Sequence, residues 1–310
     1  MIHPIVGIGE LLWDVYPDGR KVAGGAPFNF AFHCHQLGHP AVIVSRVGND
    51  DLGRELRERV RELGLSDEYI QTDHEHPTGT VQVSLDANAV PTYTITENVA
   101  WDFIEWDEKL KVLAERAAAV CFGTLAQRSG TPVTLQRIVD LVRERRPTGL
   151  IVFDVNLRGS FFQPLTLDLG LAISDWQKVN EDEFAILEGL TGLRWESSPV
   201  GSWLRCGVTI KTRGSEGCEV YHCWEVDDGE GGEYYPDETF TVPGVPAKVV
   251  DTVGAGDAFT AAMVCLHLEG KSLRECARFA VHYAAKVCEQ PGGTPRIDRQ
   301  DVERAAFGAK

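Results

Sequence analysis

Short apolar runs that alternate with helical patterns limit most strongly how this chain of 310 residues can fold. The strand-like runs are Ile5–Ile8, Ala41–Val47, Val120–Gly123, Leu150–Phe153, Trp176–Asn180 and Val208–Lys211. Leu150–Phe153 contains no polar residue, as expected of a strand that is buried on both faces. Helical patterns separate these runs, for example at residues 131–145. The alternation predicts an α/β fold with three layers, in which helices cover both faces of a parallel sheet.

A different pattern interrupts this order between residues 78 and 104. Thr80–Leu85 and Thr92–Thr96 alternate in polarity on either side of a turn near Asp86–Ala89, which predicts an antiparallel hairpin with one polar face. We expect strands at about residues 11–22 and 78–104 to form a small antiparallel β lid inserted into a single domain, 1–310. A lid excludes water from reactive phosphates, and an exposed edge of its sheet could pair two subunits as a homodimer.

Charge and cysteine content exclude several classes of protein. The net charge of -16 and the pI near 5.0 argue against a nucleic-acid or anionic-membrane partner, because both need a basic surface. The eight cysteines form no CxxC pair, which favours free thiols in a reducing compartment. Residues 1–10 do not resemble a signal peptide, and no run reaches the roughly 18 apolar residues of a membrane span. We therefore expect a cytoplasmic protein.

The stretch Asp251–Phe259 predicts an anion site at the start of a helix. Gly254, Ala255 and Gly256 have little side chain to keep an anion away from the unpaired N–H groups of a helix N-terminus. Asp257 would lie in the first turn, where it is either a catalytic base or only a complement to the helix dipole. A dipole role alone does not explain the small residues, so a phosphate cradle with a base beside it is favoured.

Two segments near the N-terminus are candidates for holding a hydroxylated ligand. Asp14 follows the first strand, at the sheet edge where open α/β sheets bind ligands, and a turn-capping role is the alternative. Gly25 belongs to a glycine pair that precedes a helix ending near Leu37, and Asn29 lies at the start of that helix. A glycine pair before a helix is also common in tight turns without function.

Polar residues also follow the strand Leu150–Phe153. Asp154, Asn156 and Arg158 are spaced by two, which would keep them on one side of an extended chain at the carboxyl edge of the sheet. Arg158 could orient a phosphate with its planar guanidinium, and a structural salt bridge to Asp154 is the alternative.

Two further segments suit a metal and a nucleotide. Asn180 and Glu183 lie three residues apart at a predicted helix start, which would place them together near a hydrated Mg²⁺, although acids in a first turn usually complement the helix dipole. Thr212–Gly217 contains Gly214 and Gly217, which would allow a tight turn over a nucleotide. The acidic segment 222–239 is interpreted as an exposed hairpin or loop.

Other nucleotide-binding classes lack their motifs here. The chain has no GxxxxGK[ST] phosphate loop, and no GxGxxG follows the first strand. A P-loop NTPase and a dinucleotide-binding oxidoreductase are therefore disfavoured.

Taken together, the motifs resemble those of one family. Asp251–Phe259 resembles the C-terminal signature of the ribokinase-like, or PfkB, carbohydrate kinases, and Gly24–Asn29 with Val47–Asp50 resembles their N-terminal signature. Asn180–Glu183 is similar to the family's metal-associated Asn–x–x–Glu, and Thr212–Gly217 resembles its nucleotide turn. The resemblance spans essentially the whole chain.

The resemblance implies a ribokinase-like fold and ATP-dependent phosphorylation of a sugar. Gly9–Asp14 and Asp154–Arg158 look most like fructokinases, which implies transfer of the γ-phosphate to the terminal hydroxyl of a hexose such as D-fructose. Asp257 would be the base, Mg²⁺ would bridge phosphates, and Gly293 would belong to the nucleotide site. Asp251, with backbone carbonyls near Gly292, would hold a monovalent cation such as K⁺.

Three alternatives remain open from the sequence. The protein could phosphorylate ribose or 2-keto-3-deoxygluconate, or it could be a sugar sensor without catalysis on a kinase fold. It could also be a nucleoside kinase with an aromatic pocket formed by Phe28, Phe30, Tyr93 and Trp101.

Overall fold

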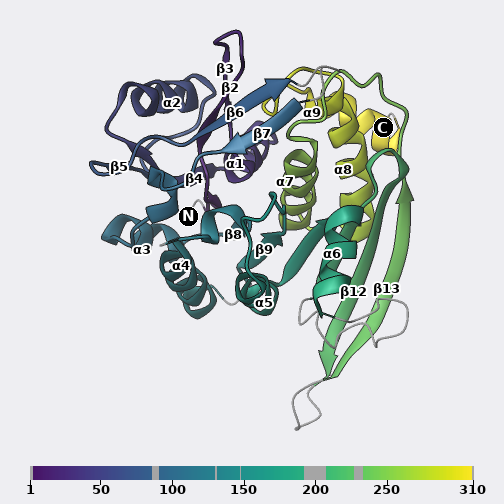
Figure 1. Ribbon diagram of the computed structural model, residues 1–310. Helices are drawn as coiled ribbons and strands as arrows, with labels where there is room; N and C mark the ends of the chain where they lie inside the picture. The colour runs from purple at the N-terminus through teal and green to yellow at the C-terminus, as the bar shows by residue number, and fades with distance from the viewer. Residues whose placement is uncertain are drawn as a thin grey trace.

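The computed structural model describes residues 3–85, 91–129, 131–146, 148–191, 207–226 and 233–308. Within these residues, nine strands form one sheet in the order β13-β12-β11-β10-β9-β8-β1-β4-β5 (Figure 1). The pairs from β11 to β5 are parallel, whereas β12 and β13 pair antiparallel at one edge. The strands are β1 Ile5–Ile8, β4 Ala41–Gly48, β5 Ile70–Asp73, β8 Ala119–Phe122, β9 Leu150–Asp154, β10 Trp176–Asn180, β11 Val208–Thr212, β12 Gly217–Val226 and β13 Glu233–Pro243.

Helices cover both faces of this sheet. Neighbouring residues of β1 enter different cores: Ile5 packs with α1, α7 and α8, and Val6 packs with α3 and α4 on the opposite face. A strand buried on both faces needs apolar residues at every position, which explains the unbroken apolar runs. The helices are α1 Ala26–Gln36, α2 Asp51–Glu62, α3 Glu108–Ala114, α4 Thr131–Arg145, α5 Pro164–Ile173, α6 Glu181–Thr191, α7 Ala255–Leu268, α8 Leu273–Cys288 and α9 Arg299–Phe307.

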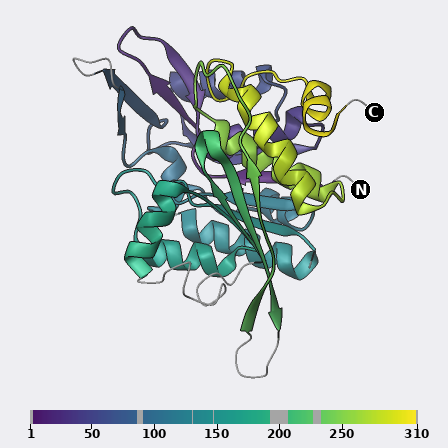
Figure 2. The same cartoon turned by 90° about the vertical axis from the view of Figure 1, so that its right-hand side faces the viewer.

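A second sheet of four strands is separate from the first. It runs in the order β3-β2-β6-β7, with β2 Leu12–Val15, β3 Lys21–Gly24, β6 Thr80–Leu85 and β7 Pro91–Ile95. It consists of two antiparallel hairpins joined by a parallel pairing of β2 with β6. Figure 2 shows this sheet standing out from the body of the molecule at the upper left. The predicted small sheet is therefore present, while its predicted turn at 86–89 lies outside the described residues.

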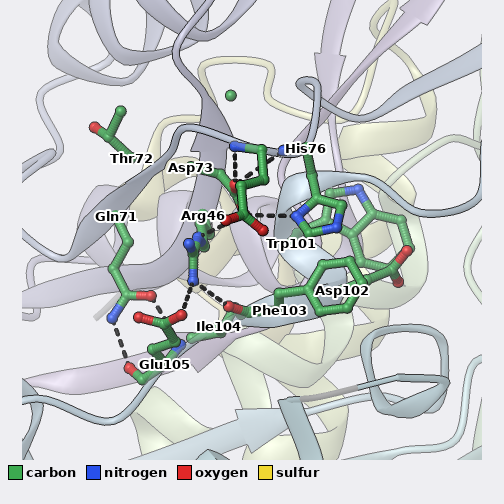
Figure 3. Close-up of polar contacts among 12 residues, drawn as sticks. Arg46, Gln71, Thr72, Asp73, His76, Trp101, Asp102, Phe103, Ile104 and Glu105 are labelled. Carbon is green, nitrogen blue, oxygen red and sulfur yellow. Dashed lines mark hydrogen bonds and ion pairs between the residues drawn. The ribbon is translucent and has the colours of Figure 1, made fainter.

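Arg46 fixes the chain where it returns from the small sheet to the main sheet (Figure 3). Its Nε lies 2.8 Å from the buried Asp73 carboxylate, and its Nη1 donates to the Phe103 carbonyl at 2.7 Å and contacts Glu105 at 2.8 Å. His76 binds the same Asp73 and stacks on the ring of Phe103 at 3.9 Å. This network joins β4, β5 and the 3-10 helix η1 Ala100–Phe103, which follows β7.

Most predicted elements are observed, and a few were not predicted. The predicted helix at 131–145 is α4. The described residues of the acidic segment, 222–226 and 233–239, belong to the antiparallel strands β12 and β13, which Figures 1 and 2 show extending away from the body. β5, α3 and α5 were not predicted. In the described part of the chain, no helix has the length and apolar character needed to cross a membrane.

Candidate active site

The first turn of α7 and the first turn of α1 meet at the carboxyl edge of the main sheet. Asn29 Nδ2 in α1 donates a hydrogen bond of 2.8 Å to Asp257 Oδ2 in α7, although the two residues are 228 positions apart. Asn29 is 4% exposed, and its buried Oδ1 has no hydrogen-bond partner among the described residues. The structure thus brings together two of the predicted site residues and leaves an acceptor atom beside them.

The turn before α7 presents unpaired amides. Gly254 is the N-cap with φ of 75°, a left-handed conformation that favours glycine. The amide of Ala255 donates to the Thr252 carbonyl at 3.3 Å, whereas within the described structure the amides of Gly256 and Asp257 have no hydrogen-bond acceptor. Free N–H groups at a helix start are suited to an anion, as the sequence predicted.

Glycine is required at this turn because the next loop packs directly against it. A Cβ placed on Gly254 would lie 2.6 Å from Gly293, and a Cβ on Gly293 would lie 2.9 Å from the Asn29 amide. Asp251 ties the two loops together, since its carboxylate accepts N–H groups from Val253 at 3.0 Å and from Gly292 at 2.8 Å. Both oxygens that would face a monovalent cation therefore already accept one hydrogen bond each.

His33 fixes the same loop from the α1 side. A carbonyl can only accept, so the contact of 3.0 Å between His33 Nε2 and the Gly293 carbonyl makes Nε2 the protonated nitrogen. His33 Nδ1 then accepts the hydroxyl hydrogen of Tyr283 at 3.0 Å, and Tyr283 in turn accepts from Gln36 at 2.8 Å. Burial lowers the pKa of His33 to about 4, which agrees with a neutral ring.

Lys178 and Asp154 form a buried ion pair that sequence reasoning missed. Lys178 Nζ lies 3.1 Å from Asp154 Oδ1, and Thr260 of α7 donates to Asp154 Oδ2 at 2.9 Å. A Cβ on Gly256 would lie 3.0 Å from Lys178 Nζ, so the ammonium lies against the first turn of α7. Burial lowers the pKa of Lys178, but Asp154, Glu183 and Asp257 outweigh it and raise the pKa above its usual value.

Asp257 is half-buried among these charges. Burial, followed by the nearby Asp154 carboxylate, raises its pKa to about 6. The hydrogen bond from Asn29 and the positive charge of Lys178 act in the opposite direction. A carboxylate with a pKa just below neutrality is well suited to accept a proton at physiological pH.

The loop after β9 differs from the prediction. Asn156 has φ of 45°, so the chain turns there and does not remain extended. Arg158 is exposed, and among the described residues its side chain donates only to the Leu157 carbonyl, at 3.2 Å. The predicted alternative of a salt bridge to Asp154 is therefore wrong. Asp154 pairs with Lys178 instead, because β10 lies beside β9 with these two residues in register.

Asp14 and the glycine pair lie together. Asp14 is on β2, and a Cβ on Gly24 would lie 2.8 Å from its Oδ2. Burial raises the pKa of Asp14 to about 6. Gly25 has φ of 121°, and a Cβ there would lie 2.2 Å from the Glu10 carbonyl, so only glycine fits.

Glu10 is a second residue that the sequence analysis did not single out. It follows β1, is 4% exposed, and accepts the amide hydrogen of Ala26 at 3.2 Å through Oε1, while no described residue lies within hydrogen-bond distance of Oε2. Burial raises its pKa to about 7. A buried acid at the end of a central strand was a visible signal, because this edge is where ligands bind.

We expect Glu10→Gln to stabilise the protein above neutral pH. The pKa of Glu10 is about 7 in the folded protein and 4.5 ordinarily, so the folded state holds the proton more tightly than the unfolded state. The free energy of unfolding therefore begins to fall above pH 4.5, and the loss reaches its full size above pH 7. Glutamine avoids that cost, worth about 3 kcal/mol at pH 8 and less than about 1 kcal/mol at pH 5. Chemical unfolding of both proteins at the two pH values measures the difference. An equal effect at both pH values would contradict a buried ionisable Glu10.

Asn180 and Glu183 form a reciprocal helix cap at the start of α6. Glu183 Oε2 accepts the Asn180 amide hydrogen at 2.9 Å, and Asn180 Oδ1 accepts that of Glu183 at 2.8 Å. Glu183 Oε1 also accepts from Leu157 at 3.0 Å. Each oxygen keeps a lone pair that could accept a hydrogen from metal-bound water. This donor set fits hydrated Mg²⁺, which prefers to keep several waters, better than a direct cage. Three or more clustered metal-ligating side chains are not found in the described residues.

The predicted nucleotide turn lies at the carboxyl end of β11, beside β10. Thr212 Oγ1 donates to the Val179 carbonyl at 3.3 Å. Gly214 and Gly217 have φ of 51° and 96°, and space is open next to the Cα of Gly214. The glycines therefore make the tight turn that the sequence predicted.

The aromatic residues considered for a nucleoside pocket are mostly in the core. Phe28, Phe30 and Trp101 are 0%, 1% and 0% exposed, and Tyr93 alone is open to solvent. The predicted base-binding pocket of these four residues is therefore wrong.

Comparison with known proteins agrees with this architecture. The model of the family described as pfkB family carbohydrate kinase matches residues 16–299. A sugar kinase of Pyrococcus horikoshii, called uncharacterized in its solved structures, is 30% identical over 95% of this chain and 93% of its own. Its structure in complex with ATP superposes with a TM-score of 0.77 over 97% of both chains.

Two named enzymes are more distant. A fructokinase of Klebsiella pneumoniae is 27% identical over 83% of this chain and 82% of its own. The structure of Arabidopsis thaliana ribokinase, complexed with ribose and ATP, has a TM-score of 0.78 over 99% of both chains at 23% identity. That likeness shows that the fold is ribokinase-like.

Proposed function

The chain belongs to the pfkB family of carbohydrate kinases, and we propose that it transfers the γ-phosphate of ATP to the terminal hydroxyl of a hexose, D-fructose being the first candidate. The observation that carries this proposal is Asp257, bound by Asn29 next to unpaired amides at a helix start. The similar fructokinase of Klebsiella pneumoniae supports the choice of sugar.

Asp257 accepts the proton of the attacking hydroxyl as that oxygen bonds to the γ-phosphorus and the bond to the β-phosphate oxygen breaks. The turn Gly254–Gly256 stabilises the charge on the transferred group through its backbone amides. The amide of Gly256 is free to donate a hydrogen bond to that group. Lys178, which lies against this turn, adds a buried ammonium. Positioning supplies much of the acceleration in such reactions.

The acceptor is held by the residues around the glycine pair. Asp14, Gly25 and Asn29 approach from the small sheet and from α1, and Asn156 and Arg158 from the loop after β9. Arg158 has no ion-pair partner in the described structure, so it is free to approach an anionic ligand.

The nucleotide lies over the turn of Thr212, Gly214 and Gly217, with Gly293 on the opposite side. Asn180 and Glu183 would hold Mg²⁺ through water, and the ion would neutralise phosphate charge. Asp251, with carbonyls near Gly292, would hold K⁺.

Measuring ADP release tests this function directly. Fructose, ribose, 2-keto-3-deoxygluconate and adenosine are supplied with Mg²⁺-ATP, and thermal shifts with each acceptor report binding separately. We expect ADP release with fructose. Release with adenosine alone would favour a nucleoside kinase, and binding of a sugar without ADP release would favour a sensor.

Activity is expected to fall as the pH drops through about 6. The base must be ionised, and the pKa of Asp257 is raised to about 6, so kcat/KM for the acceptor should rise up to that pH and then level off. Because the pKa of Asp14 is also about 6, Asp14→Asn serves as the control and should keep the acidic limb. A profile that is flat from about pH 5 to 8 would contradict Asp257 as the base.

A further inference from the structure

A cavity of about 200 Å³ opens between the end of the small sheet and the loop after β9. Its lining includes Asn98, Thr124, Arg128, Ser160, Phe161 and Gln163. Hydroxyl, amide and aromatic groups predominate, which is the composition that recognises a hydroxylated ring.

Arg128 is the buried donor of this cavity. Its Nε and Nη2 bind the two oxygens of Asp102 at 2.7 and 2.9 Å, and Nη2 also donates to the Thr96 carbonyl at 2.7 Å. The rings of Trp101 and Phe161 lie 4.3 and 4.9 Å from the guanidinium carbon. The side chain is only 9% exposed, and its Nη1 has no partner. Four neighbours thus hold the guanidinium rigidly in the cavity wall, and Nη1 is itself buried.

The cavity adjoins the loop that carries two of the residues proposed to bind the acceptor, Asn156 and Arg158. Thr124 donates to the Val155 carbonyl at 2.8 Å and contacts that of Asn156 at 3.3 Å. Ser160 and Phe161 follow Arg158 in the same loop, and Asn98 follows β7 of the small sheet. An acceptor held by this loop would have the cavity wall next to it.

The charge of the cavity distinguishes between acceptor classes. Asp102, visible with Trp101 in Figure 3, neutralises Arg128 through two hydrogen bonds. Glu97 adds a negative charge to the lining, and the remaining lining residues are uncharged. A carboxylate would therefore meet no net positive charge, whereas a hydroxyl can both donate to and accept from the amides and hydroxyls of the lining.

We propose that this cavity binds the end of the acceptor opposite the phosphorylated hydroxyl, and that the Arg128–Asp102 pair selects a neutral hydroxylated sugar over a sugar acid. The inference rests on the proposed function, and it makes Arg128 and Asp102 specificity-determining residues. It favours fructose or ribose over 2-keto-3-deoxygluconate.

The test compares fructose with 2-keto-3-deoxygluconate by thermal shift and by ADP release. The unaltered protein should prefer fructose in kcat/KM by about tenfold or more. Asp102→Asn leaves Arg128 uncompensated and should move that ratio towards the acid by about tenfold. Glu97→Gln, on the exposed rim, should move it in the same direction and does not endanger folding. Asp67→Asn removes a carboxylate that pairs with Arg61 outside the cavity and should leave the ratio unchanged.

Ser160→Trp, which narrows the cavity, should raise KM for fructose without changing the KM for ATP. An equal or greater preference of the unaltered protein for the acid, or normal fructose KM in Ser160→Trp, would overturn the inference. Fructose-induced stabilisation that Ser160→Trp weakens, without ADP release by either protein, would instead contradict the kinase function while supporting the cavity.

Discussion

Replacing Asp257 with asparagine is expected to lower kcat by about 10²- to 10⁴-fold, because the variant keeps the shape of the side chain but cannot accept the hydroxyl proton. The contact with Asn29 can persist, since the amide introduced at position 257 could donate to the Asn29 oxygen that now lacks a partner. The affinity for the acceptor should therefore change little. Steady-state kinetics and acceptor-induced thermal shifts measure the two quantities separately.

The matched control is Asp301→Asn. Asp301 is also an acid in the first turn of a helix, α9, but its carboxylate pairs with Arg304 on the surface. If first-turn acids act only through the helix dipole, both variants should lose about 1 kcal/mol or less of stability and keep activity. If Asp257→Asn has a kcat close to that of Asp301→Asn, Asp257 is not the catalytic base.

Local signals in the sequence were sufficient for the anion turn but not for its surroundings. Small residues followed by an acid predict the turn Gly254–Asp257, since its geometry depends on neighbours in the chain. The contact of Asn29 with Asp257 spans 228 positions, and only the family resemblance connected them. Lys178 and Asp154 are paired because their strands are neighbours in register, which requires the strand order.

Other misses have local causes. The interpretation of Asp154, Asn156 and Arg158 assumed an extended chain, but Asn156 adopts a positive φ, which asparagine tolerates better than most residues. Helix α5 was not predicted because its apolar residues do not follow a single face: Leu165 and Leu169 are exposed, whereas Leu167 and Leu171 are buried. In both cases the sequence pattern allowed a conformation that the surrounding structure did not select.

The second large effect is expected for Lys178→Met, which should reduce the free energy of unfolding by about 3–5 kcal/mol. Methionine fills similar space but leaves the Asp154 carboxylate buried with only the Thr260 hydroxyl as partner. Urea unfolding measures the loss. Lys211→Met is the control on the neighbouring strand β11, where a partly exposed ion pair to Glu219 at 3.9 Å is worth less than about 1 kcal/mol.

Adding Asp154→Asn to Lys178→Met separates the structural from the chemical contribution. Removing both charges eliminates the uncompensated carboxylate, so the double variant should regain most of the lost stability. The amide oxygen introduced at position 154 can still accept from Thr260, which preserves the contact with α7. Activity should nevertheless remain low, since the turn of Gly256 has lost the ammonium that lies against it. Full recovery of both stability and kcat in the double variant would instead show that Lys178 only compensates the charge of Asp154 and has no role in catalysis.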